Sequence, residues 1–94
     1  MLEALVEDFL GYCKISDFTN KSIETLRLRL NELSGFLKLE GVFQVKDITY
    51  TRLRGFVGDY KNPSVHTKKA RVWSLHQFFH YLKVKGHIEE NKIV

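Results

Sequence analysis

Cysteine and long apolar runs are scarce in this sequence. The only cysteine, Cys13, has no second thiol for a disulfide and lies in no metal or redox motif, so we expect a partly buried thiol in a reducing compartment. No apolar run approaches the roughly 18 residues that span a bilayer, and no signal-peptide pattern follows Met1. These absences predict a cytoplasmic protein without a membrane segment.

Proline is also rare, and the composition excludes disorder. The chain has one proline and 44% apolar residues, which is enough for one compact core. Its 94 residues correspond to one domain at roughly 100–200 residues per domain. We therefore expect a single domain over residues 1–94.

Acidic residues are absent from residue 61 to residue 88. This stretch carries six lysines and arginines and all four histidines, whereas residues 1–20 carry four carboxylates and one lysine. Such a charge distribution attracts polyanions, of which nucleic acid is the commonest in a cytosol. A merely solvated helix face is the alternative interpretation.

Apolar residues recur every three or four positions through most of the chain, which predicts helices. Thr19, Thr49 and Ser64 are expected N-caps, and Gly41 and Gly86 are expected helix stops. The short apolar stretch at 42–48 would be a strand without a partner, so it is expected to be a packed linker. The pattern predicts an all-α four-helix bundle with helices at about 2–14, 20–40, 50–60 and 64–85.

The last predicted helix has two contrasting sides. Its expected inward side is Val72, Leu75, Phe79 and Leu82. The outward side has cations, hydrogen-bonding groups and an indole, but no carboxylate that would repel phosphate. Lysine suits phosphate, whereas His, Gln and Thr can reach base edges in the major groove, so double-stranded DNA is the expected partner. The outward and flanking residues are His66, Thr67, Lys69, Ala70, Trp73, His76, Gln77 and His80.

Several of these residues have alternative interpretations. Trp73 could lie against a sugar or a thymine methyl, or it could be buried against a neighbouring helix. His76 and His80 have the i, i+4 spacing of a zinc pair, but no further ligand has convincing spacing, so no metal or other cofactor is expected. Phe78 and Tyr81 are expected to be core rather than a platform for bases.

The second predicted helix makes a secondary case for DNA contact. Lys21, Ser22 and Arg27 lie near its N-terminus or off its apolar stripe, and helix N-termini favour phosphate. Arg27 and Arg29 could instead form ordinary ion pairs with neighbouring glutamates.

The segments "FTNKSIETLRLRLNELSGFL", "DITYTRLRGFV" and "TKKARVWSLHQFFHYLKVKGHIEEN" together cover nearly the whole chain. In this order they resemble the N-terminal core-binding domain of tyrosine recombinases and phage integrases. The resemblance implies a SAM-like four-helix bundle that forms half of a clamp on DNA, with its second and fourth helices facing the major groove. Self-association with other protomers on DNA is compatible with it. The DNA-contacting positions that it implies are Lys21, Ser22, Arg27, His66, Thr67, Lys69, Ala70, Trp73, His76 and Gln77, and Lys68 beside them is also expected to contact DNA.

Two departures from the family pattern stand out. The family often has arginine where this chain has Ala70, His76 and Gln77, and we expect Lys68, Lys69 and Arg71 to compensate. The Asn-Pro that usually follows the fourth helix is Asn91-Lys92 here.

No catalytic constellation is apparent. In the family, a tyrosine nucleophile and its arginines belong to a separate C-terminal domain, which we expect to lie beyond Val94. None of the four tyrosines here lies beside a His-x-x-Arg pattern. The sequence therefore predicts a DNA-binding domain that has no catalytic activity of its own and binds neither a membrane nor a small-molecule ligand. A helical domain whose basic helix docks an acidic protein is the alternative.

Overall fold

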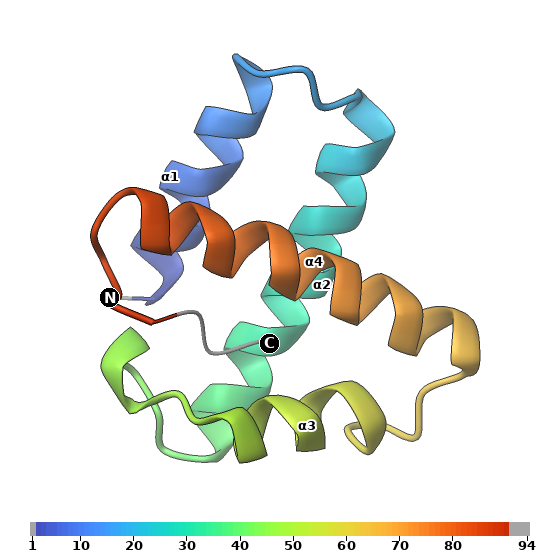
Figure 1. Cartoon of the computed structure of the whole chain (residues 1–94). Coiled ribbons are helices and arrows are strands. Elements are labelled where there is room, and N and C mark those ends of the chain that lie inside the picture. Colours follow the sequence, from blue (N-terminus) through green and yellow to red (C-terminus); the bar gives the residue numbers. More distant parts are fainter. Residues whose placement is uncertain (1, 91–94) are drawn as a thin grey trace.

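The computed structural model describes residues 2–90 and consists of helices (Figure 1). No strand occurs within that range. A short 3₁₀ turn, η1 (Val45–Asp47), lies in the linker that was expected to be packed, and Val42, Val45 and Ile48 of this linker are buried. The all-α prediction is confirmed. The four α-helices are α1 (Leu2–Lys14), α2 (Asn20–Leu39), α3 (Tyr50–Gly58) and α4 (Val65–Val84).

The fourth helix crosses in front of the first two. In Figure 1, α1 and α2 run side by side, α4 lies across them, and α3 lies at the lower end of α2. α4 contacts each of the other three helices, and α1 packs against α2. One face of α4 is therefore covered along much of its length, and the opposite face is directed away from α2.

Hydroxyl side chains begin three of the helices, as predicted. Thr19, Thr49 and Ser64 each accept a hydrogen bond from the backbone amide three residues later. This bond satisfies one of the free amides of a first helical turn.

Glycine ends α2 and α4 in the same manner. Gly41 (φ 73°) and Gly86 (φ 81°) adopt the left-handed conformation, which costs glycine little because it has no Cβ. The next amides, those of Val42 and His87, reach back 2.8 Å to carbonyls in the last turn. Both predicted stops are confirmed.

The link between α3 and α4 is short and conformationally unusual. Lys61 (φ 57°) and Asn62 (φ 49°) both have positive φ, which side chains other than glycine adopt uncommonly. Pro63 follows directly and fixes its own φ. The chain therefore reverses sharply between the two helices.

The predicted inward face of α4 is wrong at one position. Val72 is 37% exposed, whereas Arg71 is 2% exposed and belongs to the interior. Leu75, Phe79 and Leu82 are buried as expected, and Ser74 and Phe78 join them. The buried positions follow the intervals of a helix face that packs on several neighbours: Arg71, Ser74, Leu75, Phe78, Phe79 and Leu82.

No helix within residues 2–90 is long and apolar enough to cross a lipid bilayer.

Candidate nucleic-acid interface

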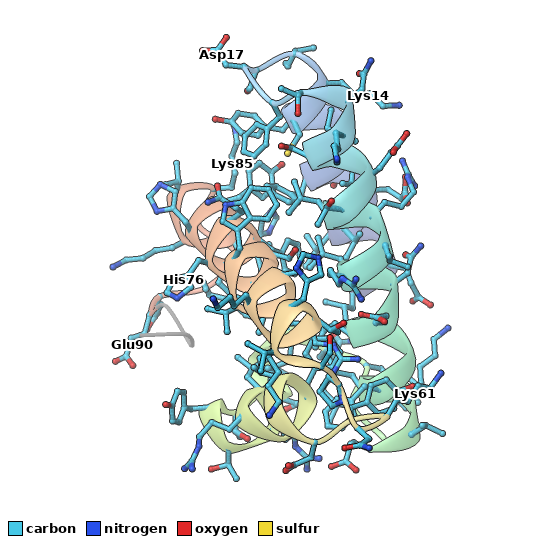
Figure 2. All side chains as sticks on the ribbon, turned by 90° about the vertical axis from the view of Figure 1, so that its right-hand side faces the viewer. Lys14, Asp17, Lys61, His76, Lys85 and Glu90 are labelled. Carbon is cyan, nitrogen blue, oxygen red and sulfur yellow. The ribbon has the colours of Figure 1, made fainter. Side chains whose placement is uncertain are left out.

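The outward side of α4 is open to solvent. His66, Lys69, Trp73, His76 and His80 are exposed, and Gln77 is half-buried. We call these six residues the outer face of α4. In Figure 2, His76 points away from α2, on the side of the molecule that is at the front of Figure 1. Trp73, for which the sequence left burial against a neighbouring helix open, is 37% exposed and therefore not fully buried.

A shallow apolar groove runs along one edge of this face. Val65, Val72 and Trp73 supply its apolar surface. Lys68, Lys69 and His76 complete its lining, and none of the lining residues is acidic.

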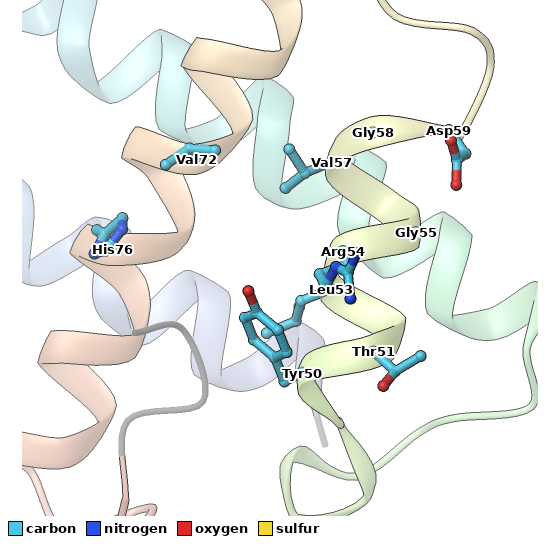
Figure 3. Close-up of a pocket in the computed structure, with 10 residues that line it drawn as sticks. All are labelled: Tyr50, Thr51, Leu53, Arg54, Gly55, Val57, Gly58, Asp59, Val72 and His76. Carbon is cyan, nitrogen blue, oxygen red and sulfur yellow. The ribbon is translucent and has the colours of Figure 1, made fainter.

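A second hollow separates α3 from α4 (Figure 3). Val72 and His76 form its α4 wall, and Tyr50 and Val57 of α3 point toward them. Asp59 is the carboxylate on its lining, and in Figure 3 it points away from Val72 and His76. The two hollows share Val72 and His76, so they form one continuous surface on either side of these residues.

The carboxylates that form ion pairs lie elsewhere. Within residues 2–90, the acidic partners are Glu3, Glu7, Glu32 and Glu40, on α1, on α2 and directly after α2. Lys68 and Lys69 take part in none of these pairs. Their charges therefore remain available to an external anion.

Arg71 is not a surface cation, which corrects the expectation that it compensates for missing arginines. Its Nη1 donates to the backbone carbonyls of Phe56 (2.8 Å) and Tyr60 (2.9 Å), and its Nε faces Oε1 of Glu32 at 3.4 Å. The guanidinium also lies over the rings of Phe56 and Tyr60. A buried charge needs such partners, because desolvation without them is costly. Arg71 joins α4 to α2 and to the end of α3.

The contact residues expected on α2 are not gathered with those of α4. Arg27 pairs with Glu7 of α1 at 3.0 Å, which directs it toward α1, whereas Glu32 of the same helix reaches Arg71 of α4. Arg29 pairs with Glu32 at 3.0 Å, as the alternative interpretation of the sequence had it. Lys21 is exposed at the start of α2. The structure thus groups the α4 residues and leaves those of α2 apart.

Ser22 and Thr67 have a structural role at helix starts. The hydroxyl of Thr19 donates to Ser22 Oγ at 3.0 Å, and the hydroxyl of Ser64 donates to Thr67 Oγ1 at 3.1 Å. Each pair also carries the capping bond from the backbone amide of its second member. Helix capping therefore explains both hydroxyls without a ligand.

The α1 side of α4 is aromatic and closely packed. Tyr81 lies 5.1 Å, between ring centres, from both Phe9 and Tyr12, and Phe78 is buried beside Phe9, in agreement with the expected core role. Burial, with a smaller contribution from the charge of Asp8, raises the pKa of Tyr81. Burial likewise raises the pKa of the Cys13 thiol, which is fully rather than partly buried.

In the part of the chain that the structure describes, no three His, Cys, Asp or Glu side chains are grouped so that they could hold a metal ion. The pair of His76 and His80 thus has no third ligand of these types within residues 2–90.

Comparison with known proteins adds no relative. The chain matches no protein-family model, no curated protein and no solved structure. The likeness to recombinase core-binding domains is therefore one of sequence motifs.

Proposed function

We propose that this chain is a DNA-binding domain that lays the outer face of α4 in a groove of duplex DNA. One observation carries the proposal: the outer face and the adjoining groove expose Lys68, Lys69 and hydrogen-bonding side chains without a carboxylate on their own surface. Duplex DNA is a polyanion whose major groove admits one α-helix. Lys68 and Lys69 would contact phosphates, and Gln77, His66 and His76 would reach base edges or phosphates.

The sequence motifs suggest the biological setting. We infer that the parent protein is a site-specific tyrosine recombinase or integrase and that this domain grips the core recombination site, while the catalytic residues follow Val94. The test is the coding sequence downstream of Val94. A segment with the recombinase arginines and nucleophilic tyrosine is expected, and an unrelated segment would contradict the inference.

Salt titration tests DNA binding directly. Anisotropy of a labelled random duplex should show log K falling linearly with log salt, by about 0.9 per phosphate contact. Lys69→Ala should reduce the steepness by about 0.9, because it removes one contact. Lys14→Ala is the matched control, since Lys14 is an exposed lysine at the end of α1, away from His76 in Figure 2. Affinity that does not depend on salt would contradict the proposal.

Docking of an acidic protein is the second candidate. The exposure of Val72 and Trp73 in one groove favours it, because aromatic anchors dominate protein interfaces. Backbone amide shifts on addition of duplex DNA separate the two functions. Shifts along α4 are expected for DNA binding, whereas no shifts with DNA, but shifts along α4 with an amphipathic peptide of Leu and Glu, would favour protein docking.

A further inference from the structure

Apolar side chains lie in the middle of the cationic surface. Val65 is 67% exposed, and Val72 and Trp73 are each 37% exposed, in the same groove as Lys68 and Lys69. Single exposed apolar residues need no explanation, but we take the grouping of these three in one groove, beside two lysines, as the starting point for a binding surface. Its ligand should offer apolar groups and anionic groups close together.

The spacing of the side chains favours a linear ligand. Lys69 and Lys83 are fourteen residues apart on α4 and nearly on one side of it, which corresponds to about 21 Å along the helix axis. A polyanion that follows the helix meets both lysines. A short peptide in the groove would meet only those at its rim.

The major groove of DNA provides both kinds of group. Phosphates form its walls, and the C5-methyl of thymine is the apolar group on its floor. Val65 and Val72 are seven residues apart, about 10 Å along the helix axis, and a helix in the major groove reaches about three successive bases over a span of this length. One strip of α4, formed by Val65, Val72 and Trp73, could therefore contact methyl groups on neighbouring base pairs.

We propose that Val65, Val72 and Trp73 contact thymine methyl groups, so that the domain prefers A·T-rich duplex DNA. This inference rests on the proposed function and names the bases that the same face reads. Lys68 and Lys69 bind the phosphate backbone of the DNA beside the strip, and the apolar side chains discriminate between bases.

Removal of the methyl group tests the contact. Binding is measured to two duplexes of equal length, one of alternating dA and dT and the other of alternating dA and dU, which keeps the pairing but lacks the methyl. For each methyl group that the strip buries, the wild type should bind the dU duplex roughly three- to fivefold more weakly, as expected from the transfer of one methyl group out of water.

Two variants test whether the contact lies on α4. Val65→Thr and Val72→Thr keep the β-branched shape and a similar helix propensity but replace a methyl with a hydroxyl. Each should reduce the difference between the duplexes. Ile15→Thr is the control, because Ile15 is 86% exposed in the turn that also carries Asp17, away from His76 in Figure 2, and it should keep the full difference.

The outcomes separate this inference from the proposed function. Salt-dependent binding of equal strength to both duplexes would overturn the thymine contact and leave DNA binding in place. A difference that persists in both valine variants would overturn the role of this strip. Absence of duplex binding, with binding of an acidic amphipathic peptide instead, would overturn both.

Discussion

Arg71 holds Phe56 in two ways at once. Its Nη1 donates to the backbone carbonyl of Phe56 over 2.8 Å, and its guanidinium carbon lies 4.6 Å from the centre of the same residue's ring. Carbonyls in the last turn of a helix have no partner within the helix. Arg71 supplies such a partner from α4, so the most buried cation of the helix stabilises the fold and does not face a ligand.

Replacement of Arg71 should therefore affect stability strongly. Arg71→Met keeps the length of the side chain but leaves two carbonyls without a donor and Glu32 without one of its cations, so we expect a loss of about 3 kcal/mol in the free energy of unfolding. Lys69→Met, on the exposed side, should change it by less than about 0.5 kcal/mol. Urea unfolding followed by circular dichroism measures both. Equal losses would contradict the role assigned to Arg71.

Two serines associated with α4 should respond oppositely to the same substitution. Ser64 caps the helix, so Ser64→Ala should lower the free energy of unfolding by about 1 kcal/mol. Ser74 is buried, and its Oγ has no hydrogen-bond partner among residues 2–90, so Ser74→Ala should raise it by about 0.5 kcal/mol. Thermal unfolding of the two variants gives the comparison. A loss at Ser74 equal to that at Ser64 would show that the buried hydroxyl is in fact bonded.

The pair of Arg27 and Glu7 should weaken any contact of Arg27 with DNA. Glu7→Gln releases Arg27, so if the sequence-predicted contact of Arg27 adds to those of α4, duplex affinity at low salt should rise by roughly two- to fivefold, the range of an exposed ion pair. Glu3→Gln is the matched control for Glu7→Gln, because it removes the same charge from α1 and releases Lys38 instead of Arg27. If both variants raise affinity equally, net charge alone is responsible and Arg27 does not contact DNA.

Trp73 should report binding without a label. It is the only tryptophan of the chain and is partly exposed on the outer face of α4. Duplex DNA that covers this face would shield the indole, so quenching of its fluorescence by acrylamide should decrease when DNA is added. Raised salt should restore the quenching, because it releases the phosphates. Unchanged quenching on saturation with DNA would place the contact on another surface.

Alkaline pH should destabilise the fold through Cys13. Burial raises the pKa of this thiol in the folded protein, whereas the unfolded thiol keeps a pKa of roughly 8.5. Stability is therefore unaffected by this group below that value and falls as pH rises from there toward the folded pKa. Urea unfolding at several values between about pH 7 and about pH 9.5 should show a shallower decline for Cys13→Ala. Parallel declines would contradict the assignment.

The ends of the helices could be predicted because they depend on local chemistry. Thr19, Thr49 and Ser64 begin helices as expected, and Gly41 and Gly86 end them. The predicted ends of α2, α3 and α4 differ from the observed ones by one or two residues, since terminal residues make only part of the helical bonding. The apolar stripe of α2, from Ile23 to Leu37, is buried throughout, as its spacing predicts.

The side of α4 was harder to predict because residue type and position conflict there. Val72 is apolar and Arg71 is charged, so hydropathy places the valine inside. The structure reverses them, because the carbonyl of Phe56 in α3, the carbonyl of Tyr60 just after α3 and Glu32 of α2 satisfy the arginine. Those partners are distant in sequence, so the periodicity of apolar residues along α4 does not predict them. The adjacent phenylalanines Phe78 and Phe79 were the sequence signal that the buried face of α4 is wide. A face wide enough to bury both also includes position 71.

The reversal at Lys61 and Asn62 connects α3 to α4, the two helices that form the hollow of Figure 3. Two consecutive left-handed residues followed by a proline have few alternative conformations. The guanidinium of Arg71 then ties the carbonyl of Tyr60, next to this reversal, to α4. The two walls should therefore keep their separation when a ligand binds, so a ligand has to fit a hollow whose width is already set.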